Sequence, residues 1–107
     1  MNDKIKDSLT DELFDAILTL ETREECYMLF EDLCTVSEIK SLASRLQVAL
    51  LLSQGHTYTE IFEITGVSTA TISRVNRCLE YGADGYKTVI ARIGHINNLP
   101  DGKESTE

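Results

Sequence analysis

Residues 57–75 read TYTEIFEITGVSTATISRV, and this stretch decides the fold because it holds two helix starts on either side of a glycine. Thr57 with Glu60 three residues later is the pattern of a capping box, in which each side chain accepts a hydrogen bond from the other residue's free backbone amide. Gly66 can end this first helix, since glycine takes a left-handed backbone without a Cβ clash. Ser68 can then cap a second helix. The stretch therefore predicts two short helices joined by a tight turn.

The second helix has one apolar face and one face of small, hydroxylic and basic side chains. The apolar face repeats at three and four residues through Ile72, Val75 and Leu79, and Ile61 and Ile64 are expected to point inward from the first helix. Small side chains on the opposite face let a helix enter the roughly 12 Å wide major groove of DNA. We interpret the segment 57–80 as a DNA-binding helix-turn-helix, with expected DNA contacts at Thr57, Tyr58, Thr59, Ser68, Thr69, Ala70, Thr71, Ser73, Arg74 and Arg77.

An ordinary helical hairpin is the alternative interpretation of the same residues. In that case the glycine only makes the turn, and the serine and threonine side chains form a solvated surface. Phe62 favours this alternative, because many helix-turn-helix units have a small residue at the fifth position of the first helix. A bulky residue there puts the angle between the two helices in doubt.

The rest of the chain contains four further helix patterns and no strand pattern. The predicted helix starts lie at Ser8 or Thr10, at Thr22 with Glu25, at Thr35 with Glu38, and at Asp84, and the predicted stops include Gly55 and Gly82. The expected inner faces carry Leu13, Phe14, Ile17 and Leu18; Cys26, Leu29, Phe30 and Leu33; Ile39, Leu42, Leu46, Ala49 and Leu50; and Tyr86, Val89, Ile90, Ile93 and Ile96. We predict an all-α fold of about six helices, with one domain over residues 9–99 between a flexible arm at 1–8 and a flexible tail at 100–107.

The net charge of −8 is unevenly distributed along the chain. Residues 1–38 hold three basic and eleven acidic side chains, whereas residues 39–99 hold six basic and four acidic ones. A distant acidic region is compatible with DNA binding because salt screens charges over about 8 Å. The overall charge nevertheless predicts weak non-specific binding to DNA.

Composition also excludes several classes of protein. The 107 residues contain no apolar run of the roughly 20 residues that a membrane span needs, and no signal sequence, so we expect a cytoplasmic protein. Cys26, Cys34 and Cys78 occupy apolar helix positions and are expected to be reduced thiols in a core. No cysteine or histidine pair has metal-ligand spacing, so no metal site is expected. The small size favours a homodimer, since a shared apolar surface adds stability.

The segment Glu38–Leu79 resembles the tryptophan repressor superfamily, and the segment 9–96 resembles its YerC/YecD-type branch. The likeness is carried by LASR at 42–45, the Gly55 stop and TATISR at 69–74. The resemblance implies an all-helical, intertwined homodimer whose N-terminal helices build a shared core.

The same resemblance implies how such a dimer meets DNA. Operator contacts map to Thr69, Ala70 and Thr71, and a phosphate-side contact maps to Ser73. The two recognition helices then enter successive major grooves, so two-fold symmetry implies a palindromic site with half-sites about 10 bp apart or at a related spacing.

The resemblance also implies a pocket for tryptophan, with Arg45 and Arg74 on either side of the indole and Thr35 near the carboxylate. Two positions depart from the family pattern, because Val75 replaces a glycine and Cys78 replaces a serine. Valine adds bulk where the indole would lie, and a thiol is a poor partner for an ammonium group. We therefore expect no required cofactor, with Arg74 as a phosphate contact and Thr35 as an N-cap. Tryptophan or another small corepressor is the alternative.

We predict a dimeric, sequence-specific regulator of transcription that binds double-stranded DNA and represses by occlusion. Enzymatic activity is not expected, because His56 and His95 are the only histidines and are both expected on the surface, and no glycine-rich phosphate loop follows a strand. The alternative is a helical protein–protein interaction module of the transcription machinery without its own sequence-specific DNA binding. Such a module would use the acidic N-terminal face with Glu24, Glu25 and Glu31.

Overall fold

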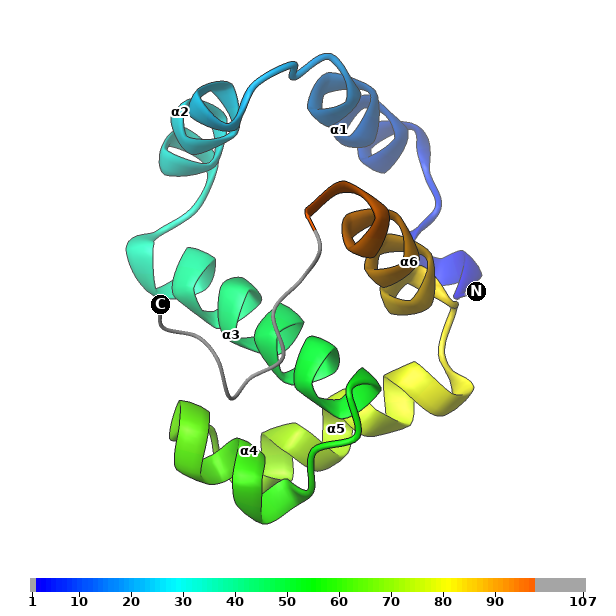
Figure 1. Cartoon of the computed structure of the whole chain (residues 1–107). Coiled ribbons are helices and arrows are strands. Elements are labelled where there is room, and N and C mark those ends of the chain that lie inside the picture. The colour runs from blue at the N-terminus through cyan, green and yellow to red at the C-terminus, as the bar shows by residue number, and fades with distance from the viewer. Residues whose placement is uncertain (1, 98–107) are drawn as a thin grey trace. The chain divides into compact units, whose positions relative to one another are not determined.

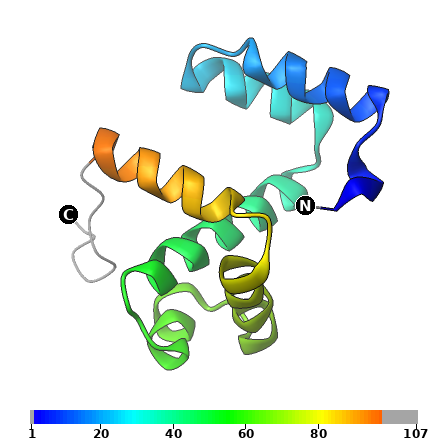
Figure 2. The same ribbon diagram turned by 90° about the vertical axis from the view of Figure 1, so that its right-hand side faces the viewer.

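A computed structural model gives the architecture of the protein and describes residues 2–97, with side chains described for residues 2–94. Within this range six α-helices follow one another (Figure 1, Figure 2): α1 Ser8–Leu18, α2 Arg23–Leu33, α3 Val36–Ser53, α4 Tyr58–Thr65, α5 Thr69–Tyr81 and α6 Gly85–Asn97, preceded by a 3-10 helix at Asp3–Ile5. The described residues contain no strand, which confirms the predicted all-α fold. The predicted tail at 100–107 lies outside the described residues, as do residues 98–99. The chain divides after Lys40 into an N-terminal and a C-terminal unit.

The first helix is capped by a residue that the sequence pattern did not single out. Asp7 is the N-cap of α1, and its Oδ1 accepts a hydrogen bond from the backbone N–H of Thr10 at 2.7 Å. This bond holds the pKa of the Asp7 carboxyl below its usual value. The predicted caps at Ser8 and Thr10 are therefore wrong, because a carboxylate accepts from a free helical amide more strongly than a hydroxyl does. The predicted arm at 1–8 includes the 3-10 helix.

Thr22 and Thr35 cap α2 and α3 as predicted. Thr35 forms a full capping box, since its Oγ1 accepts from Glu38 N at 3.1 Å and Glu38 Oε1 accepts from Thr35 N at 2.8 Å. At α2 the glutamate reaches one residue further back. Thr22 Oγ1 accepts from Glu25 N at 3.1 Å, while Glu25 Oε1 accepts from the N–H of Glu21 at 2.8 Å.

The apolar faces of the N-terminal unit are uncovered. No residue of α1 or α2 is buried, although both helices carry the predicted apolar rows. Leu9 and Leu18 of α1 are 75 % and 80 % exposed, and Val36 at the start of α3 is 72 % exposed. These exposed apolar side chains are available for contact with another chain.

All three cysteines are free thiols, as predicted, but their predicted place in a core is wrong. Cys26 and Cys78 are exposed, and Cys34 is half-buried. Helical periodicity identifies the apolar side of a helix, and it does not determine which of these sides a single chain covers.

The core belongs to the C-terminal unit. Its buried residues are Val48, Ala49 and Leu51 of α3, Ile61 of α4, and Ile72 and Val75 of α5, with Leu52, Val67, Tyr86 and Ile90 packed against them.

The predicted inner positions of α5 are confirmed, and Leu79 is half-buried. Ile64 is 42 % exposed, contrary to the prediction, because three residues turn the helix by about 300° and leave Ile64 at the edge of the stripe centred on Ile61. Leu42 and Val89 are also exposed, and Ile96 lies outside the described side chains.

Backbone geometry explains where the helices of this unit end. Gly55 has a left-handed φ of 91° after α3, as its predicted role requires. Gly82 ends α5 with an extended φ of −86°. A Cβ at Gly82 would clash with the backbone carbonyl of Cys78, which lies four residues earlier in the last turn of α5, so the chain can leave the helix in this conformation only with glycine here. Asp84 has a φ of 68° before α6, and its carbonyl accepts from Thr88 N at 3.0 Å.

Candidate nucleic-acid interface

The first helix of the candidate interface starts at a complete capping box. Thr57 Oγ1 accepts from Glu60 N at 3.1 Å, and Glu60 Oε1 accepts from Thr57 N at 3.0 Å, so both predicted bonds are present. Ile61 anchors α4 from one turn further on, since its side chain is fully buried. The start and the rotation of α4 are therefore both fixed by local sequence.

The turn between α4 and α5 depends on Gly66, which has a φ of 74°. Thr65 supports the same turn, because its Oγ1 donates to Ile61 O at 2.8 Å and accepts from Val67 N at 3.0 Å. Val67 then packs against the core. Phe62, which raised doubt about the angle between the helices, is 50 % exposed. Much of its ring therefore lies outside the packing between helices.

Ser68 caps α5 as predicted. Its Oγ accepts from the backbone N–H of Thr71 at 3.2 Å and donates to Thr71 Oγ1 at 3.2 Å. Ile72 and Val75 are buried on the inner side. This arrangement leaves the outer side of α5 exposed at Thr69, Ala70, Ser73, Arg74 and Arg77, while Thr71 is half-buried.

The outer side of α5 forms a hollow of about 560 Å³ lined by Ala70, Thr71, Ser73, Arg74 and Arg77. We call this surface the α5 outer face. Neither arginine forms a salt bridge with any acidic side chain in the described part of the chain. Two unpaired guanidinium groups beside small side chains present a positive, accessible surface, which is the chemistry that binds phosphate and base edges.

Five of the ten predicted DNA contacts line this hollow, and the others have different positions. Thr57 and Ser68 serve as helix caps. Tyr58 is 37 % exposed and Thr59 is exposed in the first turn of α4. Thr69 is exposed in the first turn of α5. All of these residues belong to the two helices of the helix-turn-helix or their caps.

The positions of the predicted effector pocket are divided between the two units. Thr35 belongs to the N-terminal unit, and its hydroxyl accepts the capping bond from Glu38. In the C-terminal unit, Val75 is 2 % exposed and belongs to the core. The valine side chain at this position therefore packs inside the core.

The charges of Arg45 and Cys78 affect the pKa of a third residue, Tyr86 of α6. Burial raises the pKa of the Tyr86 hydroxyl above its usual value, the charge of Cys78 adds to this rise, and the charge of Arg45 opposes it. Tyr86 also packs against the core. The sequence placed Tyr86 on the inner side of α6 but gave no signal for its proximity to these two side chains.

His56 was expected on the surface, and this expectation is wrong. Its side chain is 5 % exposed, and its Nδ1 lies 3.3 Å from Glu60 Oε1. The signal in the sequence is the position of His56 directly before the N-cap Thr57 and four residues before Glu60. His95 lies outside the described side chains.

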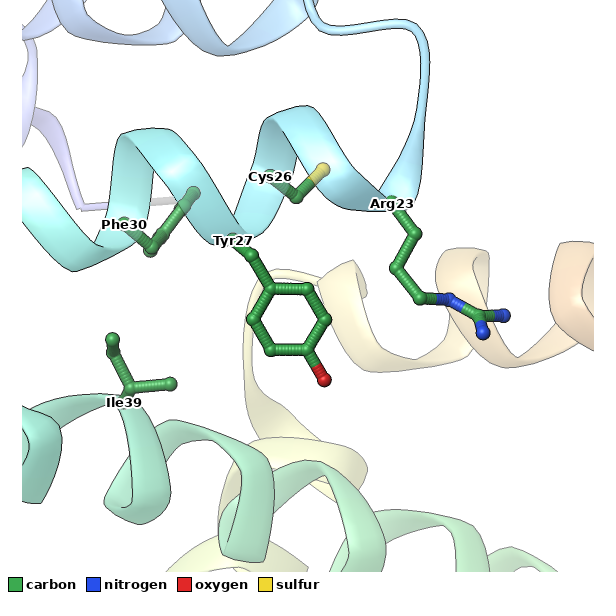
Figure 3. A pocket seen from close by; sticks show the side chains of 5 residues that line it. All are labelled: Arg23, Cys26, Tyr27, Phe30 and Ile39. Carbon is green, nitrogen blue, oxygen red and sulfur yellow. The ribbon is translucent and has the colours of Figure 1, made fainter.

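A second hollow lies within the N-terminal unit. It has a volume of about 240 Å³ and is lined by Arg23, Cys26, Tyr27, Phe30 and Ile39. Figure 3 shows the Tyr27 ring extending from α2 toward the side of α3, with Phe30 on α2, Ile39 on α3 and Arg23 at the start of α2. Its walls are almost entirely apolar, so it is suited to apolar side chains and lacks the chemistry of a DNA contact.

Neither a metal-binding cluster nor a membrane span occurs among the described residues. No group of three or more histidine, cysteine, aspartate or glutamate side chains gathers there as metal ligands would. Among the helices described, none has the length and apolar character that a membrane span requires.

Comparisons with known proteins agree with this geometry. The sequence model of the family described as Trp repressor protein matches residues 8–94. The chain is 54 % identical over 91 residues to the uncharacterized protein YerC of Bacillus subtilis strain 168, which covers 85 % of this chain and 88 % of YerC. A candidate Trp repressor from Staphylococcus aureus has a similar crystal structure, with a TM-score of 0.84, 56 % identity and coverage of 88 % of this chain and 95 % of that chain. A TrpR-like protein from Eubacterium eligens ATCC 27750 also has a TM-score of 0.84, at 53 % identity, with 87 % and 96 % covered.

The fold and the α5 outer face define an all-α protein of the helix-turn-helix class. Within that class, the match over most of its length shows that the chain belongs to the Trp repressor family.

Proposed function

We propose that this protein is a sequence-specific DNA-binding regulator of transcription that binds a palindromic operator as a homodimer. The α5 outer face carries the proposal, because it combines unpaired Arg74 and Arg77 with the small side chains of Ala70 and Ser73. Such a face can approach base edges closely while the arginines neutralise phosphates. Membership of a family of DNA-binding regulators supports the same conclusion.

The homodimer is supported by the N-terminal unit. Leu9, Leu18 and Val36 are each more than 70 % exposed, and the apolar hollow around Tyr27 offers a place for apolar side chains of another chain (Figure 3). Covering one such side chain removes apolar surface from water at about 25 cal/mol per Å². The partner that we propose is a second copy of the chain, because it carries the same exposed apolar surface and is present wherever the protein is made.

Repression follows from the dimer by a simple physical route. A dimer with two recognition helices covers two half-sites about 10 bp apart, and a promoter covered in this way is closed to other proteins. We further propose that DNA binding requires no small molecule. The buried Val75 and the Cys78 thiol support this, since they replace the small and hydroxylic residues that the family pattern has at these positions.

Charge reversal on the α5 outer face tests the proposal. Arg74→Glu and Arg77→Glu should each abolish binding to duplex DNA that the wild-type protein retains, as followed by fluorescence anisotropy. Arg92→Glu is the matched control, because Arg92 is an exposed arginine on α6 and the change in net charge is the same. Normal DNA binding by a folded Arg74→Glu variant would contradict the assignment of the recognition surface.

A helical interaction module is the second candidate function. The acidic charge and the uncovered apolar residues of the N-terminal unit favour it. Glu24→Lys and Glu31→Lys separate the two functions, since these exposed residues are remote in sequence from α5 and form no capping bond. Loss of a protein partner with both substitutions, together with unchanged behaviour of Arg74→Glu in the same assay, would favour the interaction module.

A further inference from the structure

We infer that a ligand site lies between α3, α5 and α6, and that it takes a short apolar peptide with free termini. The site is separate from the α5 outer face, and its ligand binds in the absence of DNA. The inference therefore goes beyond the proposed function.

The C-terminal unit contains a hollow of about 420 Å³ where three of its helices meet. Its walls come from the last turns of α3 and α5 and from the first two turns of α6. We call it the three-helix hollow, and its lining includes Leu52, Ser53, Leu79, Glu80, Lys87 and Ile90. Sites for small ligands have volumes from about 300 Å³ upward, so the hollow is large enough for one.

The apolar part of the wall consists of side chains that the core covers only in part. Leu52 and Ile90 pack against the core and are half-buried, and Leu79 is half-buried as well. All three are aliphatic and line the hollow. A ligand with aliphatic side chains would remove this remaining surface from water, which favours binding.

Glu80 and Lys87 place a carboxylate and an ammonium group in the same hollow, on two different helices. Neither side chain forms an ion pair in the described part of the chain. Each charge is therefore free to pair with an opposite charge on a ligand. A ligand that satisfies both must carry a cation and an anion besides its apolar part.

The separation of these two charges favours a peptide over a single amino acid. Because Glu80 and Lys87 do not pair with each other, the ligand must span the space between their charged groups. A free amino acid carries both charges on one carbon, whereas each further residue of an extended chain moves the termini apart by about 3.5 Å. Ser53 adds an acceptor for a peptide N–H, because its Oγ donates to Leu50 O at 2.7 Å and keeps its lone pairs.

Isothermal titration calorimetry of the full-length protein with leucyl-leucine, without DNA, tests for the site. We expect a Kd of about 0.1 to 1 mM for a ligand of this size. Ala91 is an exposed residue of α6 that also lines the hollow, so Ala91→Phe should fill it and abolish binding. Ala43→Phe is the matched control at an exposed position of α3 outside the hollow, and it should bind as the wild type does. No binding by the wild-type protein, or unchanged binding by Ala91→Phe, would overturn the site.

Blocking one terminus of the peptide at a time tests which side chain holds which end. Lys87→Gln should weaken binding of leucyl-leucine about fivefold, the upper end for an exposed ion pair. It should not affect leucyl-leucine amide, which has no carboxylate. Glu80→Gln should weaken leucyl-leucine by a similar factor and should not affect N-acetyl-leucyl-leucine, which has no ammonium group. Lys40→Gln and Glu63→Gln make the same changes at exposed positions outside the hollow and should alter nothing.

Two further results would contradict the inference. Equal losses for free and blocked peptides would show that Glu80 and Lys87 do not contact the termini. Leucine that binds as tightly as leucyl-leucine would overturn the assignment to a peptide. None of these titrations includes DNA, so their outcome is independent of whether the proposed function holds.

Discussion

The Nδ1 atom of His56 lies 3.3 Å from the Oε1 atom of Glu60, and the same carboxylate oxygen accepts the backbone N–H of Thr57 at 3.0 Å. The His56 side chain is almost completely buried, at 5 % exposed. Glu60 thus links His56, in the segment between α3 and α4, with Thr57 at the start of α4. This carboxylate therefore adds a contact to His56 to the capping box and the buried Ile61 that hold the start of α4.

Glu60→Ala should destabilise the protein by about 1 to 2 kcal/mol, because it leaves the Thr57 amide and the His56 ring without their carboxylate partner. Glu63→Ala is the matched control on the same helix. Glu63 is exposed and takes no part in the capping box, so its loss should change the free energy of unfolding by less than about 0.5 kcal/mol. Urea denaturation followed by circular dichroism measures both values. Equal effects of the two substitutions would contradict the role of Glu60.

Gly66→Ala should destabilise the protein by about 1 kcal/mol, since alanine is strained at a φ of 74°. Backbone strain alone accounts for this loss of stability, because a Cβ at Gly66 would meet no atom within 4 Å. Gly94→Ala has equally open space but lies within α6, so it should stabilise the protein by about 0.5 to 1 kcal/mol. Thermal denaturation of the two variants should therefore show shifts of opposite sign.

The Tyr86 hydroxyl should ionise at a higher pH than an ordinary tyrosine, because burial raises its pKa. In the unfolded chain this hydroxyl ionises near pH 10. Its contribution to stability is therefore fully present below that pH and is lost as the pH rises through the higher pKa of the folded state. An absorbance titration should show a late phenolate component that Tyr86→Phe removes. If Tyr81→Phe removes it instead, the assignment is wrong, since Tyr81 is 84 % exposed.

Leu18→Asp should convert the protein from a dimer to a monomer. Leu18 is 80 % exposed in the single chain, so the substitution removes little from the folded monomer but places a charge in a covered apolar surface if a second copy packs there. Phe62→Asp is the control, because Phe62 is 50 % exposed on α4 and belongs to the C-terminal unit. Sedimentation equilibrium of both variants checks the result. A dimer that survives Leu18→Asp unchanged would exclude α1 from the interface.

The sequence predicts the helix-turn-helix in detail because its signals are local. The capping box of Thr57 and Glu60, the left-handed Gly66 and the N-cap Ser68 each depend on residues within four positions, and all are confirmed. Ile61 was also predicted correctly, whereas Ile64, predicted from the same spacing, is exposed.

Features that depend on contacts between helices were harder to predict. The burial of His56 requires the end of α3 and the start of α4 to fold together, and the proximity of Tyr86 to Arg45 requires α6 to pack near α3. The exposure of Cys26 depends on which apolar face a single chain can cover. The periodicity of apolar residues predicts neither these contacts between helices nor which apolar face a single chain covers.

Selection of duplex DNA from a random pool by the purified wild-type protein tests the central claim most directly. The selection is run at about 50 mM and about 200 mM salt, with and without tryptophan, because non-specific phosphate binding weakens steeply over this range while base recognition persists. We predict an enriched palindrome with half-sites about 10 bp apart, retained at the higher salt and independent of tryptophan. A folded, dimeric protein that enriches no sequence under any of these conditions would contradict the account.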